Sequence, residues 1–226
     1  MISDKTVGRL SLYRRTLQRM LAEGREYVYS HEIAHACGVT AAQVRRDLMP
    51  TGFTGTPKRG YSVAALLQSI GNLLDDPEKQ RVALVGIGNL GRAILAYFTG
   101  RRPNLAIVAA FDQDPNKVNQ TIHGCRSYPM EELGGTIEEK QIEVAIIAVP
   151  ASAAQAIADR LVSHGVRGLL NFAPVSLRVP SDVYVEDLDM AISLERVAYF
   201  ARHGVGGRRQ ETVSYTHLRA HETVLD

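Results

Sequence analysis

The apolar residues of this chain follow helical periods over roughly the first 72 positions and then gather into strand-length runs. In the first part, a helix is predicted from about residue 4 to residue 23, with Gly24 as its end. Its core-facing side consists of five apolar residues that fall on one face: Leu10, Tyr13, Leu17, Met20 and Leu21.

A second, shorter helix is predicted in the segment "HEIAHACG". We expect Ser30 to cap its start and Gly38 to end it. Three of its apolar residues are expected to face inward: Ile33, Ala34 and Cys37.

A third helix is predicted in "VTAAQVRRDLM". Thr40 and Gln43 have the spacing of a capping box, so this helix should begin at Ala41. Val44 and Leu48 form its apolar side. A helix, a tight turn with glycine and another helix together make the helix-turn-helix pattern.

The stretch "TGFTGTPKRGYSVAALL" is rich in Gly, Pro and Thr before it becomes apolar. This composition predicts a hairpin wing with Lys58 and Arg59 at or near its tip. Residues 1–78 are therefore expected to form a winged helix-turn-helix domain.

An acidic, proline-containing boundary, "LLDDPEKQ", covers residues 73–80. Beyond it, helical stretches separate the first four of five apolar runs. Strands alternating with helices predict an α/β fold with a doubly wound parallel sheet, and nearly continuous apolar runs fit a sheet buried on both faces. The runs cover residues 82–85, 106–111, 144–149, 168–172 and 183–185.

The C-terminal part is divided into three segments by the same patterns. Residues 79–187 should hold the sheet domain, and residues 188–203 a final amphipathic helix with Ile192, Val197 and Phe200 among its apolar positions. Residues 204–226 have no helical stripe. We interpret them as a disordered or non-native tail, read through a cloning or sequencing-adaptor junction, and exclude them from the fold.

A Gly-x-Gly-x-x-Gly fingerprint follows the first strand-like run and opens a helical segment. Its first glycine permits a tight turn, its second lets the backbone approach a pyrophosphate, and its third lets helix and strand pack closely. The helix start also offers free N–H groups and a positive dipole end to phosphates. The expected cofactor contacts here are Gly86, Gly88, Asn89, Leu90 and Gly91.

Three further residues are expected to complete the cofactor site. Asp112 lies 21 residues past Gly91, where a carboxylate accepts hydrogen bonds from the adenosine ribose and repels a 2′-phosphate, which favours NAD(H). Val149 and Pro150 end a strand-like run, and such ends face the cofactor crevice. The alternative for all three is a role in turn formation.

Charge is unevenly distributed along the chain. Residues 1–61 hold ten Lys or Arg and five Asp or Glu, which leaves +5 there and −3 on the remainder of a chain with net charge +2. A basic N-terminal domain suits a polyanion such as nucleic acid, and a solvated surface explains the charge equally well.

The remaining composition describes an ordinary globular chain without a predicted membrane span or metal site. No apolar stretch reaches about 18 residues, and the N-terminus lacks the apolar core of a signal peptide. Cys37 and Cys125 lie far apart and lack neighbours with metal-ligand spacing. Free thiols in a cytoplasmic protein are expected.

A dehydrogenase requires a positioned acid or base, a carbonyl clamp and a substrate wall, and neither the histidines nor a motif in this sequence indicates them. No Tyr-x-x-x-Lys pair is present, and no residues remain for a substrate domain. We therefore expect a regulator and not an enzyme. The histidines occur in the helix-turn-helix region (His31, His35), near a turn (His123), at a helix end (His164), after the last helix (His203) and in the tail (His217, His221).

The second helix of the helix-turn-helix and the wing carry the polar residues expected to contact DNA. Such a helix can lie in the major groove, where Arg reads guanine and Gln reads adenine, while basic wing residues reach phosphates or the minor groove. As alternatives, Arg46 could pair with Asp47 or Glu32, and Arg59 could support the wing. The expected contacts are Gln43, Arg45, Arg46, Lys58 and Arg59.

Over about residues 8–203, the sequence resembles the Rex family of redox-sensing transcriptional repressors. The similarity lies in "GVTAAQVRRDL", "KRGYSV", "VGIGNLGRA", "AAFDQDPNKV", "AVPASAAQAIADRLVSHGVRGLLNFAP" and "LERVAYF". The resemblance implies a homodimer in which each subunit has a winged-helix domain, an NAD(H)-binding domain and an exchanged C-terminal helix. It also implies binding to palindromic operator DNA when NADH is scarce, and release by NADH.

The resemblance also implies a polar relay between the two domains, with Arg15, Tyr97 and Asp189 at the matching positions. As alternatives, Arg15 could be a surface charge and Tyr97 a core residue. Met190 replaces the Leu or Phe common in the family and is expected against the partner's nicotinamide site. The wing, "DLMPTGFTGTPKRGYSV", also departs from the usual "DLSYFGEFGKRGVGY".

Discrimination between the two redox forms follows from charge. An apolar nicotinamide pocket favours neutral NADH over the charged ring of NAD⁺, because an unpaired buried charge is unfavourable. Two other classes stay open at this point: an NAD-dependent oxidoreductase with a regulatory helix-turn-helix, and a DNA-binding sensor of another nucleotide such as a CoA derivative.

Overall fold

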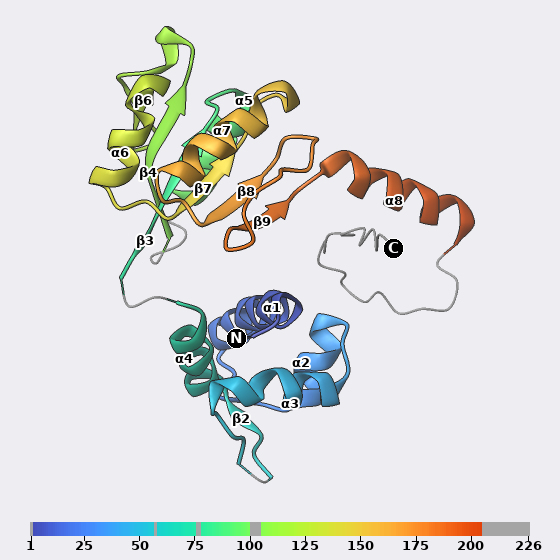
Figure 1. Ribbon diagram of the computed structural model, residues 1–226. Helices are drawn as coiled ribbons and strands as arrows, with labels where there is room; N and C mark the ends of the chain where they lie inside the picture. Colours follow the sequence, from blue (N-terminus) through green and yellow to red (C-terminus); the bar gives the residue numbers. More distant parts are fainter. Residues whose placement is uncertain (1, 57, 76–77, 100–104, 205–226) are drawn as a thin grey trace, which may run out of the picture. The chain divides into compact units, whose positions relative to one another are not determined.

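The computed structural model describes residues 2–56, 58–75, 78–99 and 105–204 (Figure 1). Chain contacts divide it into two compact units, with the change between residues 77 and 78. The expectation for the tail concerns residues outside the described part, apart from Gly204.

The N-terminal unit contains the predicted helices around one core. Its elements are α1 (Asp4–Ala22), β1 (Tyr27–Val28), α2 (Ser30–Cys37), α3 (Ala41–Leu48), η1 (Met49–Thr51), β2 (Tyr61–Ser62) and α4 (Val63–Leu74). The core includes four of the five residues predicted on the α1 face, together with the predicted apolar residues of α2 and α3. Leu21, the fifth residue, is 46% exposed and lies in the last turn of α1.

The start of α2 differs from the prediction. Ser30 is the first residue of the helix, and Tyr29 occupies the N-cap position. The backbone N–H of Tyr29 donates to Glu32 Oε2 at 2.8 Å, so a side chain one turn further along satisfies the helix start. Gly38 ends the helix with φ +70°, as predicted.

The start of α3 bears out half of the predicted capping box. Thr40 Oγ1 accepts from the backbone N–H of Gln43 at 3.1 Å, and the helix begins at Ala41. The Gln43 side chain does not return to Thr40. Its amide Nε2 donates to Asp47 Oδ1 at 2.8 Å, one turn further along the helix.

The wing is a short hairpin. β2 pairs antiparallel with β1, and an isolated bridge joins Thr56 to Gly60. Lys58 has a φ of +72°, and Gly60 a φ of +79°. A Cβ at Gly60 would also lie 2.5 Å from the carbonyl oxygen of Val28, so this position requires glycine.

The second unit is a seven-stranded sheet in the order β5-β6-β4-β3-β7-β8-β9. All neighbouring strands are parallel except β5 and β6. The strands are β3 (Gln80–Val85), β4 (Leu105–Asp112), β5 (Thr121–Ile122), β6 (Cys125–Pro129), β7 (Val144–Ile147), β8 (Gly168–Asn171) and β9 (Tyr184–Asp187).

Helices cover both faces of this sheet, which confirms the doubly wound class. α5 (Asn89–Phe98) packs on one face, while α6 (Leu133–Glu139) and α7 (Ala151–Ser163) pack on the other. From β3 the chain proceeds to β4 on one side and later to β7 on the other. The carboxyl ends of these strands therefore form the switch point at which doubly wound sheets bind ligands.

The last helix, α8 (Met190–His203), follows β9 and extends away from the sheet in Figure 1. None of its residues is buried, although it carries a series of large apolar side chains. His203, which was expected to follow this helix, is its last residue. The exposed apolar residues are Met190, Ile192, Leu194, Val197, Tyr199 and Phe200.

Candidate dinucleotide and DNA sites

The three fingerprint glycines have different surroundings at the carboxyl end of β3. Gly86 has a φ of +100°, and a Cβ there would collide with the carbonyl oxygen of Ala148. A Cβ at Gly91 would collide with the carbonyl oxygen of Gly86. A Cβ at Gly88, in contrast, would meet nothing within 4 Å. The first and third glycines are thus required by the fold itself, and the second faces open space.

The start of α5 has no side-chain cap. Gly88 is the N-cap and has no side chain to satisfy the first N–H groups of the helix. Asn89, the first helical residue, is exposed, while Leu90 packs partly on the core. This end of the helix can therefore offer free N–H donors and its positive dipole end to an anion.

Asp112 ends β4 next to the glycine loop and is buried. Its Oδ2 accepts from the backbone N–H of Ile87 at 2.7 Å, and its Oδ1 accepts from that of Asp114 at 2.9 Å. Lys117 Nζ lies 3.7 Å from Oδ2. The carboxylate therefore fixes the loop and forms the turn that was its alternative role. Each of its oxygens keeps a lone pair for a ribose hydroxyl.

Val149 and Pro150 lie just beyond β7. β7 ends at Ile147, two residues before the end of the predicted run. Val149 packs against the core, and its Cγ1 would lie 3.0 Å from a Cβ at Gly86. Pro150 is exposed and is the N-cap residue of α7. Val149 thus adjoins the loop as its wall, and Pro150 begins α7.

On the helix-turn-helix, the structure gives the predicted DNA contacts different environments. Arg45 and Arg46 are exposed, and Arg45 Nη1 donates to Ser30 Oγ at 3.1 Å. The carboxylates that were alternatives for Arg46 have other partners: Asp47 pairs with Arg9, and Glu32 with Arg25. Gln43 is half-buried and donates to Asp47.

The wing residues contact β1 and the N-cap residue of α2. Tyr29 Oη donates to the carbonyl oxygen of Lys58 at 2.7 Å, which fixes the tip against the helix-turn-helix. The Arg59 guanidinium lies 5.8 Å from the centre of the Tyr27 ring, so it supports the wing as its alternative role required. Both side chains are exposed and remain accessible to DNA.

The three relay residues occur in both units. Arg15 is an exposed residue of α1. Tyr97 is 56% exposed and packs edge-on against Phe98 at 5.3 Å, which rules out the core alternative in this chain. Asp189 caps α8, and its Oδ1 accepts from the N–H groups of Ala191 and Ile192 at 2.7 and 3.1 Å.

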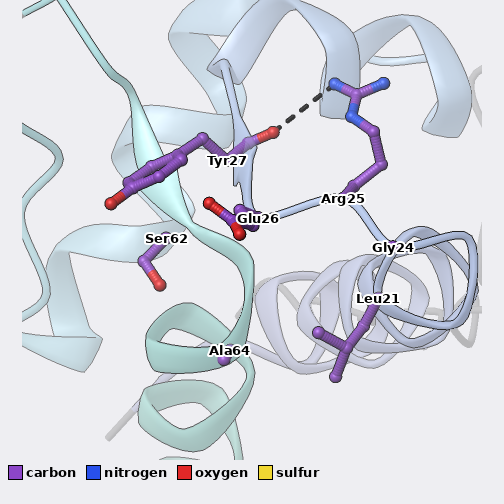
Figure 2. Close-up of a pocket in the computed structure, with 7 residues that line it drawn as sticks. All are labelled: Leu21, Gly24, Arg25, Glu26, Tyr27, Ser62 and Ala64. Atoms are coloured by element: carbon purple, nitrogen blue, oxygen red, sulfur yellow. Dashed lines mark hydrogen bonds between the residues drawn. The ribbon is translucent and has the colours of Figure 1, made fainter.

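A shallow cleft in the N-terminal unit contains none of the predicted site residues. Figure 2 shows it between the end of α1, β1 and the start of α4, with Arg25 Nη2 directed to the carbonyl oxygen of Tyr27 at 3.5 Å. The residues that line it are Leu21, Gly24, Arg25, Glu26, Tyr27, Ser62 and Ala64.

In the part of the chain that the structure describes, the two cysteines are buried thiols, and the His, Cys, Asp and Glu side chains form no candidate metal site. Burial raises the pKa of Cys37, and that of Cys125 to about 11, so neither is a thiolate at neutral pH. No group of three potential ligands gathers within the described residues. Over the same residues, no helix is long and apolar enough to span a membrane.

A group of polar residues between α1 and α3 was not predicted from the sequence. Arg9 and Tyr13 of α1 contact the buried carboxylate of Asp47 at 2.6–2.9 Å. The signal in the sequence was Asp47 itself, which occupies a position between Val44 and Leu48 on the apolar side of the helix.

A basic winged helix-turn-helix followed by a dinucleotide-binding sheet defines a DNA-binding regulator with a nucleotide-binding domain. Two family models match, one described as a putative DNA-binding protein N-terminus over residues 1–48 and one as a CoA binding domain over residues 77–175. The chain is 43% identical to the redox-sensing transcriptional repressor Rex of Anoxybacillus flavithermus, over 89% of this chain and 95% of that protein.

A similar protein, the redox-sensing transcriptional repressor Rex of Chloroflexus aurantiacus, is 44% identical over 87% of this chain and 93% of that protein. The chain belongs to the Rex family of redox-sensing transcriptional repressors. This confirms the expected family and the expectation of a regulator in place of an enzyme.

Solved structures agree with this assignment. A Rex-family repressor, RSP, matches with a TM-score of 0.79 at 30% identity, over 90% of this chain and 95% of that one. RSP in complex with β-NAD⁺ and operator DNA matches with a TM-score of 0.83 and 30% identity, over 90% and 94%. RSP in complex with β-NADH matches with a TM-score of 0.80.

Proposed function

We propose that this protein represses transcription by binding palindromic operator DNA and leaves the operator when it binds NADH. The observation that carries the proposal is its membership of the Rex family, together with its likeness to a repressor solved with NAD⁺ and operator DNA and also with NADH. The glycine loop, its open second position and the adjoining carboxylate support a dinucleotide as the signal.

NAD(H) is assigned to the carboxyl end of the sheet. The pyrophosphate lies over Gly88 and the start of α5. Gly88 has no side chain to block its approach, and the first N–H groups of the helix can donate to it. The ribose hydroxyls donate to Asp112, whose charge disfavours the 2′-phosphate of NADP(H). Gly86, Asn89, Leu90, Gly91, Val149 and Pro150 complete the assigned site.

DNA is assigned to the exposed face of α3 and to the wing. Arg45 and Arg46 precede the buried Asp47 on α3, and their exposed guanidinium groups suit the edges of guanine and the phosphates. Lys58 and Arg59 are held at the wing tip by contacts with Tyr29 and Tyr27. Residues 1–78 form the DNA-binding domain, and residues 79–187 the NAD(H)-binding domain.

The protein acts as a homodimer in this proposal. α8 has six large apolar side chains, none of them buried, and such a surface on a helix is typically covered by another chain. Exchange of residues 188–203 between two copies covers it and brings Met190 to the partner's nicotinamide site. Two copies also present two DNA-reading helices, as a palindrome requires.

The relay extends this proposal to coupling between the sites. Arg15 on α1, Tyr97 on α5 and Asp189 at the cap of α8 carry the change between the DNA-binding and NADH-bound arrangements. NADH shifts this equilibrium only by the difference of its affinities for the two arrangements. Substitution of Asp189 with Ala should reduce release by NADH while leaving operator affinity without NADH intact.

Titration of a protein–operator complex separates the three function classes. The complex is formed with a palindromic duplex selected by the protein itself, and NADH, NAD⁺, NADPH and acetyl-CoA are added in parallel. Release by NADH at the lowest concentration supports the proposal. Release by acetyl-CoA alone indicates a CoA sensor, and NADH turnover with a carbonyl substrate indicates an oxidoreductase.

A further inference from the structure

Asp47 lies on the DNA-reading helix α3 but faces the core. The helix packs through Val44 and Leu48, and Asp47 is buried beside them with only 2% of its side chain exposed. A buried carboxylate is strongly unfavourable unless it is paired and hydrogen-bonded. The groups that satisfy Asp47 therefore restrict how α3 can lie on the domain.

Three side chains from two helices satisfy this carboxylate. Arg9 on α1 forms a bidentate pair, with Nε 2.6 Å from Oδ2 and Nη2 2.7 Å from Oδ1. Tyr13 Oη, one turn further along α1, donates to Oδ2 at 2.9 Å. Gln43 Nε2 on α3 donates to Oδ1 at 2.8 Å. Four hydrogen bonds thus converge on one side chain, and we refer to these four residues as the Asp47 clamp.

Within the Asp47 clamp, Asp47 and Arg9 are both charged over the pH range in which the protein would bind DNA. Burial opposes ionisation of Asp47, but the hydrogen bonds from Arg9, Tyr13 and Gln43 outweigh it and lower the pKa of the carboxyl. The hydrogen bond with Asp47 raises the pKa of Arg9. Charge-assisted, bidentate contacts are stronger and more directional than neutral ones.

We propose that Asp47 is the positioning residue that orients α3 for base reading, and that Gln43 belongs to this clamp and does not itself read a base. The inference rests on the proposed DNA-binding function. It replaces the expectation that Gln43 contacts adenine, because its amide already has a partner within the domain.

The need for such a clamp follows from the geometry of the helix. Apolar contacts at Val44 and Leu48 are non-directional and permit α3 to roll. A roll of about 20° moves a side-chain tip at a radius of about 6 Å by about 2 Å, which is enough to break a bidentate hydrogen bond to a base. Arg45 and Arg46 directly precede Asp47, so a fixed Asp47 also fixes them.

The bond to Asp47 and partial burial orient the amide of Gln43 toward the clamp, and its second N–H is not used by that bond. Reading adenine uses the carbonyl oxygen and the NH₂ group of Gln together, in one plane with the base. In this structure the NH₂ group donates to Asp47, and the side chain is half-buried. Turning it toward DNA would remove one of the four hydrogen bonds of the clamp.

The test uses the full-length protein and an operator that the wild type selects from a random duplex library. Fluorescence anisotropy measures affinity for this duplex, for each of its single-base-pair variants and for an unrelated duplex. The variants are Gln43→Ala, Asp47→Asn, Tyr13→Phe and Arg45→Ala, with the exposed Gln18→Ala as a matched control. Circular dichroism establishes that each variant is folded at the assay temperature.

Asp47→Asn is expected to lower the ratio of specific to non-specific affinity about tenfold or more, since α3 loses its charged anchor. Tyr13→Phe and Gln43→Ala each remove one hydrogen bond from a neutral donor to the charged carboxylate, and each should lower that ratio about fivefold. Non-specific affinity should stay unchanged. Gln43→Ala should leave the relative preference at every base pair within about twofold, whereas Arg45→Ala relaxes one position. If Asp47→Asn does not fold, the two milder variants give the result.

Two results would overturn the inference. One is that Gln43→Ala relaxes discrimination at a single base pair, which would make Gln43 a base-reading residue. The other is that a folded Asp47→Asn variant, or Tyr13→Phe together with Gln43→Ala where Asp47→Asn does not fold, keeps the wild-type ratio of specific to non-specific affinity. If the wild-type protein selects no sequence from the random duplex library, the proposed DNA-binding function itself is contradicted. The selection step therefore distinguishes failure of the proposed function from failure of the clamp alone.

Discussion

Substitution of the second and third fingerprint glycines with alanine should have opposite consequences. A Cβ at Gly91 would collide with the carbonyl oxygen of Gly86 and lie 3.5 Å from Leu84 Cδ2, so α5 must move away from β3. A Cβ at Gly88 would meet nothing within 4 Å. Gly91→Ala should therefore damage the fold, and Gly88→Ala should damage only the binding of a dinucleotide.

The expected magnitudes follow from these contacts. Overpacking typically costs about 1–3 kcal/mol, so Gly91→Ala should lower the Tm of the sheet domain by roughly 4–12 °C. Gly88→Ala should change stability by less than about 1 kcal/mol, because a poorer N-cap offsets the reduced entropy of the unfolded chain. Its methyl group enters the space assigned to the pyrophosphate and should weaken NADH binding by about 1–3 kcal/mol, or roughly 5- to 150-fold.

The assay combines thermal unfolding with titration of NADH fluorescence. The chain has no tryptophan, so the signal of the reduced cofactor is free of tryptophan emission and energy transfer. Wild-type NADH affinity in a normally folded Gly88→Ala variant would refute the placement of the pyrophosphate. A fully stable Gly91→Ala variant would refute the packing argument.

Three further predictions concern other parts of the molecule. Asp112→Asn should weaken NADH binding about tenfold and reduce the preference for NADH over NADPH. A neutral amide accepts the ribose hydrogen bonds less strongly than a carboxylate and does not repel a 2′-phosphate, and parallel titrations with the two cofactors measure both effects. Leu194→Glu, on the exposed apolar side of α8, should convert a dimer into a 24.8 kDa monomer in light scattering, and an unchanged dimer would exclude α8 from the interface. The pKa of Asp47 is lower in the folded protein than its unfolded-state value of about 3.9, so the carboxylate contributes stability above that pH and this stability is lost as the pH falls through the folded pKa. Between pH 4 and pH 2 the wild type should therefore lose stability more steeply than Asp47→Asn. Parallel slopes of stability against pH would contradict this.

The elements with a strong apolar period were predictable from the sequence. The stripe of α1 and the near-continuous runs of β3, β4, β7 and β8 are each determined by burial of one helix face or of both sheet faces. β5 and β6 were not predicted. β5 has two residues and β6 alternates polar and apolar positions in "CRSYP", so neither has a run long enough to indicate a strand.

The candidate dinucleotide site was largely predictable, because its residues follow one another in a motif with a fixed spacing. The contacts of Asp112 with the glycine loop were not, since they join residues 25 positions apart. The Asp47 clamp was missed for the same reason: Arg9 and Asp47 are 38 positions apart, and no local pattern pairs them. Ser30 was a reasonable N-cap residue type, but the N-cap is Tyr29, one residue earlier, where the local contact with Glu32 satisfies the helix start.

The reciprocal effect of operator and NADH on each other tests the central claim most directly. Operator affinity is measured with and without saturating NADH, and NADH affinity with and without the operator duplex. The account predicts that each ligand weakens the other by the same factor of roughly 5–150, as linkage requires of one coupled protein. Operator affinity that is unchanged by saturating NADH would contradict it.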